Sequence, residues 1–319
     1  MEKTNLLRSA MKRREFNILL LVVASCIILS FSAPYFLTAT NFRTVAIGFS
    51  IDGLLLIGMT MVLATGGVDL SVGSIMALAA MINGTLFTDF GVPIAVGSVI
   101  AILIATALGG FSGFMIGKVG ITPLIATLAM MGMARGLTYV ITQGATVPIS
   151  SAPPAFLNIG RGDFLGLPIL VVIFIVFIVV FDIISRRMLP FRKMYYTGSN
   201  EKSAVLSGID VQKTKLFTFA LSGLLCGFAG ILTLSRFTVA TPNSGIGAEM
   251  RIISACVIGG ASLSGGVGTV AGSVLGLILL SIIGNGLILL DVSIYWQDFI
   301  SGAILLAAVT LDTMSNKKR

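Results

Sequence analysis

The chain contains no histidine, a single tryptophan and few charged residues. Charged residues make up 11% of its 319 residues, against roughly 25% in ordinary soluble domains, and 56% are hydrophobic. This balance excludes a water-soluble globule. The absence of histidine excludes Ser-His-Asp triads and imidazole-ligated metal sites, so most familiar enzyme chemistries are excluded too, and we expect no metal and no cofactor.

Cysteine is scarce as well. Cys26, Cys226 and Cys256 each stand alone in an apolar run without CxxC spacing, which indicates small buried side chains and not a redox or metal site. No G-x-x-x-x-G-K-[ST] segment occurs anywhere in the chain. If ATP drives this protein, another chain must therefore bind it.

What the sequence does contain is a series of apolar segments, each about as long as the roughly 20 residues that cross a bilayer. We expect an all-α, polytopic helical membrane protein with about ten transmembrane helices in one domain over residues 1–319. The expected spans are 17–33, 44–64, 71–88, 93–116, 123–142, 167–184, 215–235, 249–265, 269–290 and 296–312. The long segment 143–166 between two of them is expected to be irregular, with room for one short helix.

The net charge of +8 is concentrated in three places. Basic residues cluster in segment 1–16, in or beside the loop 185–214, and in the tail 313–319. The positive-inside rule places these three segments, and so both termini, in the cytoplasm. Topology and anionic membrane lipid account for the charge, so nucleic acid is not an expected partner. We interpret 17–33 as a membrane anchor and not as a cleaved signal peptide, because its apolar run is too long.

Two glycine-rich segments interrupt the apolar pattern, at 66–74 and at 259–269. Paired glycines release the backbone from helical geometry, and Asp69 and Ser71 can cap the next helix by accepting its free amide protons. Each segment is either a sharp helix break or a place where polar backbone faces a pathway or a gate. The sequence alone leaves both interpretations open.

The internal basic loop contains a candidate short helix. Ser199 or Asn200 can cap its start, and Gly208 can supply the left-handed residue that ends it. Its expected apolar face is Ala204, Val205 and Leu206, with Glu201 near its start. Such a helix is either a solvated surface element or a knob that docks into a groove of a cytosolic partner.

Polar and charged residues inside the apolar spans are the remaining candidates. Asn83, Thr127, Asn285 and Gln297 either contribute to a pathway or form hydrogen bonds between helices. Arg135 is expected to pair, to reach the outer interface or to line a pathway, and Glu249 to stabilise a helix N-terminus. Asp52 and Asp298 are expected near the outer ends of their spans, in contact with water.

Taken in order, these segments resemble the permease subunits of bacterial ribose-type ABC sugar importers, and the resemblance covers nearly the whole chain. The matching pieces are 58–74, 122–128 with Ala134-Arg135-Gly136, the loop residues Gly198, Asn200, Ala204, Ser207, Gly208 and Ile209, then 258–266, and finally 295–312. Arg251, Ser203 and Asp52 depart from the pattern, which puts the identity of the substrate in doubt.

The resemblance implies a type II importer permease in the cytoplasmic membrane that pairs with a second copy or a paralogue. It also implies a cytosolic ATPase subunit and an extracytoplasmic sugar-binding protein, with no catalysis in this chain. The residues expected to couple to the ATPase are Ser199, Asn200, Glu201, Ala204, Val205, Leu206 and Gly208, and the pathway or gate candidates are Asp69, Ser71, Asn83, Thr127 and Asn285.

Three other functions compete with import of a monosaccharide. An ABC permease of the same general fold can carry branched amino acids or nucleosides, which the ligand of the binding protein would reveal. A secondary transporter would use an ion gradient, but the intramembrane acids do not cluster as an ion relay requires. A membrane-embedded enzyme is disfavoured because histidine and paired acids are missing.

Overall fold

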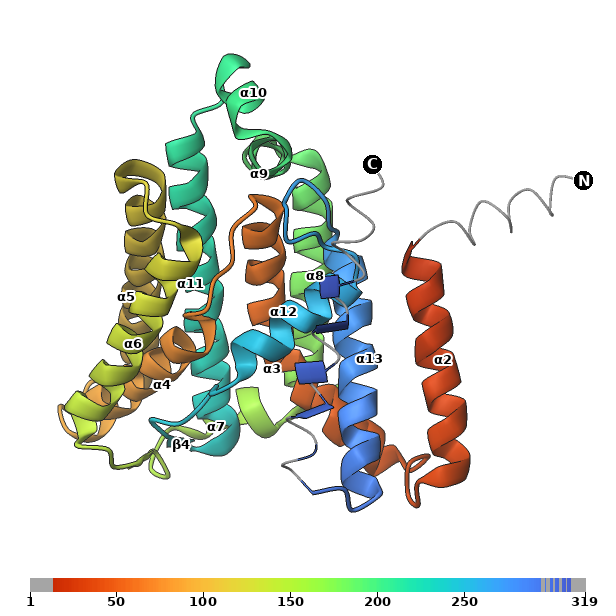
Figure 1. The fold of residues 1–319 in the computed structure, drawn as a ribbon. Coiled ribbons are helices and arrows are strands. Elements are labelled where there is room, and N and C mark those ends of the chain that lie inside the picture. The colour runs from red at the N-terminus through yellow and green to blue at the C-terminus, as the bar shows by residue number, and fades with distance from the viewer. Residues whose placement is uncertain are drawn as a thin grey trace, which may run out of the picture.

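The computed structural model describes residues 14–293 together with 296, 299–300, 302–303, 306–307 and 309–310. This part of the chain is a bundle of helices with two short β pairs (Figure 1). The helices are α2 Arg14–Ser32, α3 Ala39–Ala64, α4 Val72–Thr88, α5 Ile94–Phe114, η1 Met115–Val119, α6 Pro123–Thr142, α7 Pro154–Arg161, α8 Ile169–Arg187, α9 Leu189–Ser199, α10 Glu201–Leu206, α11 Val211–Phe237, α12 Ala248–Ile258 and α13 Val270–Leu289. Strand β1 Val147–Pro148 pairs antiparallel with β4 Val239–Ala240, and β2 Asp163–Phe164 with β3 Leu167–Pro168.

Seven helices among the described residues are long and apolar enough to cross a membrane: α2, α3, α5 continued by η1, α6, α8, α11 and α13. They correspond to seven of the ten expected spans. The expected span 71–88 is the 17-residue α4, which is apolar but shorter. The expected span 296–312 lies largely outside the described residues. The all-α polytopic class is confirmed, whereas the number of ten spans stays a prediction.

The expected span 249–265 is wrong as a continuous helix. Helix α12 ends at Ile258 and has 11 residues, about 16 Å of helix against a hydrocarbon core of about 30 Å. The next residues form a loop because Gly260, Gly265 and Gly266 adopt positive φ values, which end a helix. The chain still passes from the end of the molecule near β4 to the end near α9, since α12 rises obliquely between them (Figure 1).

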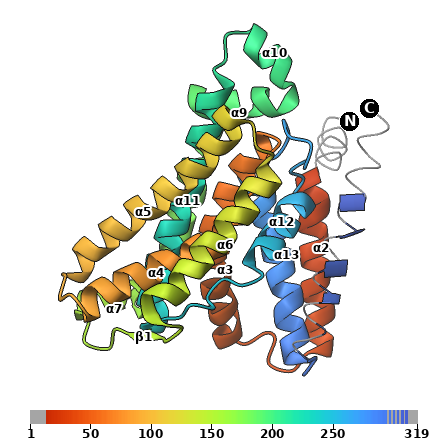
Figure 2. The same ribbon diagram turned by 60° about the vertical axis from the view of Figure 1, so that its left-hand side comes forward.

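Helix α11 is the centre of the bundle, with α3, α4 and α5 packed around it. Glycines let α5 and α11 approach closely: a Cβ on Gly109 would lie 2.3 Å from the carbonyl oxygen of Phe219, and one on Gly223 would lie 2.3 Å from that of Ala105. Glycines recur at four-residue spacing on both helices, as Gly109 and Gly113 and as Gly223 and Gly227, which places small residues on one face where helices meet in lipid. Figure 2 shows α4, α5 and α6 inclined together on one side of this centre.

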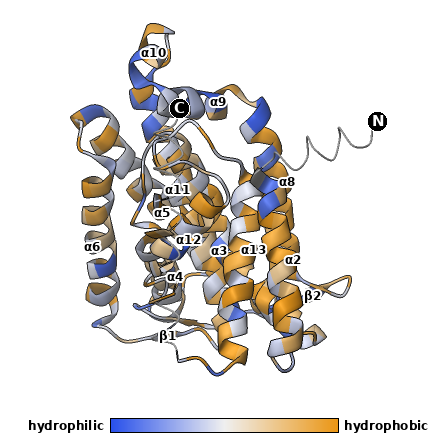
Figure 3. Ribbon diagram, turned by 45° about the vertical axis from the view of Figure 1, so that its right-hand side comes forward, coloured by the Kyte–Doolittle hydropathy of each residue, from blue (hydrophilic) through white to orange (hydrophobic). Residues whose placement is uncertain are grey.

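The outer surface of the bundle is apolar. Hydrophobic residues cover α2, α13 and much of α8, whereas hydrophilic residues gather around α9 and α10 at one end of the molecule (Figure 3). Helix α2 packs mainly on α13 and leaves side chains such as Leu20 and Ile28 exposed. The short helix expected within 143–166 is present as α7, which packs against α11 and α8.

Candidate transport cavity and docking helix

The two glycine-rich segments, far apart in sequence, meet beneath α9. The backbone N–H of Gly266 donates to the carbonyl oxygen of Ala64 at 3.0 Å. A Cβ on Gly265 would lie 2.8 Å from both the Cα of Gly66 and the carbonyl oxygen of Gly198. A side chain at Gly198 or Gly265 would collide with the neighbouring backbone, so both breaks and the end of α9 form one close-packed unit.

Helix α10 follows this unit and has the predicted caps. The side chain of Asn200 accepts the backbone N–H of Ser203 at 2.9 Å, and Gly208 has a φ of 78° just after the helix. Ser199 does not cap it, because its hydroxyl donates to the carbonyl oxygen of Tyr195. Glu201 forms an ion pair with Lys215 at 2.9 Å, which ties α10 to the start of α11.

The expected apolar face of α10 is divided in the structure. Ala204 is buried, with 3% of its surface exposed, and therefore belongs to the packing of α10 on α9 and α11. Val205 and Leu206 project into solvent, 57% and 88% exposed. Of the three apolar residues expected on this face, Val205 and Leu206 are therefore accessible to a partner and Ala204 is not.

Asp210, next to α10, is the N-cap residue of α11 and is exposed to solvent. Its side chain accepts the backbone N–H of Lys213 at 2.9 Å, and its carboxylate lies 3.1 Å from the Lys213 ammonium. The backbone N–H of Lys213, and then its ammonium, hold the pKa of Asp210 below its usual value. The carboxylate thus caps the helix in its charged form.

Asp69 is the acceptor of a buried hydrogen-bond network at the first break. Its carboxylate accepts the backbone N–H of Ser71 at 2.9 Å, the Ser71 hydroxyl at 2.5 Å and the Ser222 hydroxyl of α11 at 2.8 Å. The predicted capping is wrong for both residues: Asp69 accepts the backbone N–H of Ser71, which precedes α4, and the Ser71 side chain accepts no amide proton. Thr127 adds a link from α6, since its hydroxyl lies 3.2 Å from the carbonyl oxygen of Val68.

Two predicted asparagines join helices. Asn83 donates to the Ser98 hydroxyl across α4 and α5 at 3.0 Å, while its Oδ1 has no partner among the described residues. Asn285 of α13 exchanges two amide hydrogen bonds with Asn41 of α3, at 2.8 and 3.0 Å. Both make the helix-helix bonds that are one of the two expected roles. Gln297 lies outside the described residues.

Arg135 holds a segment of turns that joins β4 to α12. Its Nη1 donates to the carbonyl oxygen of Pro242 and, at 2.9 Å, to that of Ser244. One turn further along α6, the Tyr139 hydroxyl donates to the Asn243 side chain at 2.6 Å. Of the alternatives open for Arg135, the structure shows pairing, here with backbone carbonyls. Segment 241–247 is thereby held against α6.

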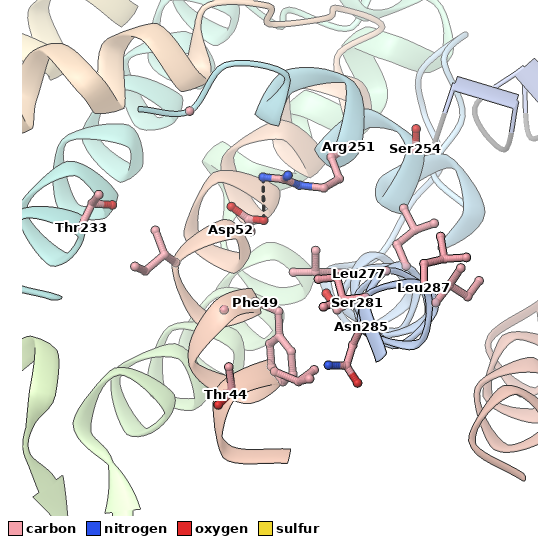
Figure 4. Close-up of a pocket in the computed structure, with 18 of the residues that line it drawn as sticks. Thr44, Phe49, Asp52, Thr233, Arg251, Ser254, Leu277, Ser281, Asn285 and Leu287 are labelled. Atoms are coloured by element: carbon pink, nitrogen blue, oxygen red, sulfur yellow. Dashed lines mark ion pairs between the residues drawn. The ribbon is translucent and has the colours of Figure 1, made fainter. Parts of the chain in front are cut away.

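A cavity of about 540 Å³ opens among α3, α11, α12 and α13 (Figure 4). Ligand sites usually measure about 300–1,000 Å³. Its uncharged polar lining is Thr44, Thr233, Ser244, Ser254, Ser281 and Asn285. Of the predicted pathway residues Asn285 lines it, whereas Asp69, Ser71, Asn83 and Thr127 do not and are buried between helices.

The cavity also contains charges that the expected topology had misplaced. Asp52 lies near the middle of the 26-residue α3, so its expected position at an outer end is wrong. The expected span begins at 44, whereas the helix starts at Ala39 and Thr38 caps it. Asp52 forms an ion pair with Arg251 of α12 at 3.2 Å (Figure 4). Both residues depart from the pattern of ribose-type permeases, and their opposite charges are the feature of the sequence that could have predicted this contact.

Long apolar helices around a polar cavity define a multi-pass membrane protein of the transport class. Residues 41–309 match the family described as "Branched-chain amino acid transport system / permease component", and the chain belongs to this family. It is 36% identical to the ribose import permease protein of Haemophilus influenzae over 315 residues, covering 98% of this chain and 96% of that one. It is 38% identical to the Bacillus subtilis ribose import permease protein, covering 90% and 88% of the two chains.

A third relative, the L-arabinose ABC transporter permease protein of Azospirillum brasilense, is 36% identical, with 91% of this chain and 85% of that one covered. No solved structure gives a significant match to the chain. The resemblance to ribose-type ABC permeases is thus confirmed. As the permease component of a transport system, the chain is a multi-pass inner-membrane subunit that works with separate ATPase and substrate-binding components.

Proposed function

We propose that this chain is the membrane passage of an ABC importer for a monosaccharide of the ribose type. The observation that carries the proposal is near full-length similarity to ribose import permeases, with an L-arabinose permease at comparable identity. A neutral sugar needs hydroxyl and amide groups along its path, and the cavity supplies serine, threonine and asparagine side chains. In this proposal the chain itself hydrolyses nothing, and the ATPase is a separate cytosolic chain.

Helix α10 is the proposed contact with that ATPase. Ser199, Asn200, Glu201 and Gly208 shape and fix the helix, and Val205 and Leu206 dock in a groove of the partner. Movement of α10 is transmitted through α9, because Gly198 touches the end of α3 and the second glycine-rich segment. This contact supports a route from the ATPase to both breaks.

Asp69, Ser71 and Thr127 are the proposed gate residues. Their hydrogen bonds hold the first break against α6 and α11, so a shift of the break must rearrange them together. Asn285 is proposed to line the path. Asn83 stays a pathway candidate because its Oδ1 is buried without a partner among the described residues.

The proposal includes a second permease copy or a paralogue, an extracytoplasmic sugar-binding protein, and both termini in the cytoplasm beside anionic lipid. The Arg251 side chain is 49% exposed in the single chain, which supports a second copy that completes the cavity wall. The basic loop 185–214 supports the orientation. Nucleic acid has no part in it.

A second candidate substrate is a branched amino acid, which the description of the family favours. The relatives that match nearly the whole chain are named as ribose and L-arabinose permeases, which favours a monosaccharide instead. An amino acid would present an ammonium and a carboxylate to the cavity, whereas a sugar presents only hydroxyls. The two substrates are therefore separable by direct transport measurements.

The test is reconstitution of this chain in liposomes with its ATPase and its binding protein. We expect ribose or L-arabinose to accumulate only with ATP on the ATPase side and the binding protein on the other. Accumulation of leucine but neither sugar would replace the substrate. Uphill movement by this chain alone, abolished by an uncoupler, would show an ion-driven transporter and refute the proposal.

A further inference from the structure

The transport cavity contains three charged side chains, Asp52, Arg236 and Arg251, on three different helices. A path for a neutral solute needs none of them. Two of the three, Asp52 and Arg251, are positions where the sequence departs from the pattern that it otherwise resembles. A charged cluster inside a transport cavity calls for a specific explanation, because charged groups at membrane depth are costly and mark substrate pathways.

The position of Asp52 within its helix shows why its charge is costly. Asp52 lies near the middle of α3, which is long enough to cross the membrane by itself. Its carboxylate Oδ2 lies 3.2 Å from an Arg251 Nη2, and the Asp52 side chain keeps 22% of its surface exposed to the cavity. Its Oδ1 accepts no hydrogen bond from the described residues. This residue lines the cavity, so one of its carboxylate oxygens is an open acceptor there.

Arg236, which also lines the cavity, supplies N–H donors that have few partners. The only hydrogen bond of its guanidinium to the described residues is a long one, from Nη1 to the carbonyl oxygen of Ile47 at 3.4 Å. The guanidinium also lies over the Phe237 ring, 4.9 Å from its centre, which fixes its plane and uses no N–H donor. A guanidinium carries several N–H donors in a planar fork, so most of them are available to a ligand in the cavity.

We propose that Asp52, Arg236 and Arg251 form a binding site for adjacent hydroxyl groups of the sugar in transit. A carboxylate oxygen accepts a hydroxyl proton, and a guanidinium fork donates to two neighbouring hydroxyl oxygens. Phe49, which lines the cavity about one turn of α3 away from Asp52 (Figure 4), gives the apolar side of such a ring a surface to lie on. The site makes the permease selective in its own right, beyond the selection made by a binding protein. This inference rests on the proposed function.

The rival explanation is that the ion pair only staples α3 to α12. A staple needs opposite charges at Asp52 and Arg251 and makes no demand on Arg236. A hydroxyl site needs an acceptor on α3 and donors on α11 and α12. Exchanging the two charges, in Asp52→Arg with Arg251→Asp, therefore preserves a staple and destroys the site.

The experiment uses the complete transporter in liposomes, with ribose, L-arabinose and their monodeoxy analogues, each at a concentration that saturates the binding protein. All variants share that binding protein, so a changed preference between a sugar and its deoxy analogue originates in the permease. The variants are Arg236→Gln, Asp52→Asn and the charge exchange. The matched control is Arg43→Gln, which removes an exposed ion pair with Asp163 outside the cavity.

We expect wild type and the control to prefer the sugar over at least one deoxy analogue by tenfold or more, because a site built to bind a hydroxyl rejects the analogue lacking it. Arg236→Gln and Asp52→Asn should lower sugar uptake at least tenfold and bring the preference within about threefold of unity. The charge exchange should behave like them. Uptake is expressed per amount of assembled transporter, so that a loss of assembly is distinguished from a loss of preference.

Wild-type preferences in Arg236→Gln and Asp52→Asn would overturn the inference and leave the proposed function standing. Recovery of wild-type uptake by the charge exchange would also overturn it, in favour of the staple. If the charge-exchanged protein does not assemble, the two single variants still decide. If the wild-type transporter moves neither sugar, the proposed function fails first, and the hydroxyl site falls with it.

Discussion

Gly198 in α9 lies directly against the carbonyl oxygen of Ala64 at the end of α3. A Cβ at position 198 would stand 2.1 Å from that oxygen and 2.7 Å from the backbone nitrogen of Gly266. One glycine thus joins α9 to both glycine-rich breaks. A displacement of α9 cannot leave the end of α3 and the second break where they are, because no side chain or space separates them.

We expect Gly198→Ala to uncouple transport from ATP hydrolysis. The added methyl forces α9 away from Ala64, at a cost of about 1–3 kcal/mol in the free energy of unfolding. Gly132→Ala is the matched control, since it lies in a helix with nothing within 4 Å of the added Cβ. The control should be neutral or up to about 1 kcal/mol more stable. Uptake per ATP hydrolysed, measured in liposomes, checks the prediction, and normal coupling in Gly198→Ala would contradict it.

Leu206→Glu should abolish binding of the ATPase without unfolding the permease. Leu206 is 88% exposed, so a charge there costs the isolated chain little, whereas a charge buried in a partner's groove is expensive. The measurement is co-purification of the ATPase with the permease from membranes. A charge at Ala204 is a poorer test, because that residue is buried within the permease.

The matched control for this prediction is Leu165→Glu. Leu165 is 90% exposed and sits in the turn between β2 and β3, at the opposite end of the molecule from α10 (Figure 3). It should leave ATPase binding unchanged. Equal binding by both variants would show that α10 is a solvated surface helix.

Local signals in the sequence identified much of this fold. Helix α6 occupies 123–142 as predicted, because Pro123 suits a first helical turn and the apolar run ends at Gln143. The caps of α10 were readable for the same reason, since Asn200 and Gly208 act within their own few residues. The division of the apolar face was not readable, because the burial of Ala204 depends on packing against other helices.

The contacts that build the site depend on tertiary structure and leave no spacing in the sequence. Arg135 binds carbonyl oxygens more than a hundred residues away, and backbone carbonyls are the same in every sequence. The failure at α12 has a different cause. Glycine and alanine extended an apolar window across 249–265, while the left-handed glycines after Ile258 ended the helix. Because α12 carries Arg251 and lines the cavity, the wrong prediction for this segment also left the cavity and its charges unpredicted.

Asp69→Ala should destabilise the permease more than the loss of any one of its hydrogen bonds. It leaves the Ser71 N–H, the Ser71 hydroxyl and the Ser222 hydroxyl without their acceptor, each at about 1–3 kcal/mol when buried. We expect a loss of about 3 kcal/mol or more, against about 1 kcal/mol for Ser222→Ala. Thermal unfolding of the detergent-solubilised protein measures both.

Ser112→Ala is the control for that comparison. The Ser112 hydroxyl is buried and has no hydrogen-bond partner among the described residues, so its removal should change stability little. Asp69→Asn should fall between wild type and Asp69→Ala, because an amide oxygen still accepts from Ser71. If Asp69→Ala and Ser112→Ala melted alike, the network would not hold the break.

Arg135→Gln should release segment 241–247 from α6 and slow transport. The variant loses the bonds to Pro242 and Ser244, about 2 kcal/mol or more for a charged donor, and Ser244 lines the cavity. Amide hydrogen exchange should therefore rise in 241–247 while α6 stays protected. Tyr139→Phe, which loses only the bond to Asn243, should show the same change at a smaller size. Unchanged exchange in Arg135→Gln together with normal uptake would mean that neighbouring helices alone position the segment, and that Arg135 has no part in shaping the cavity.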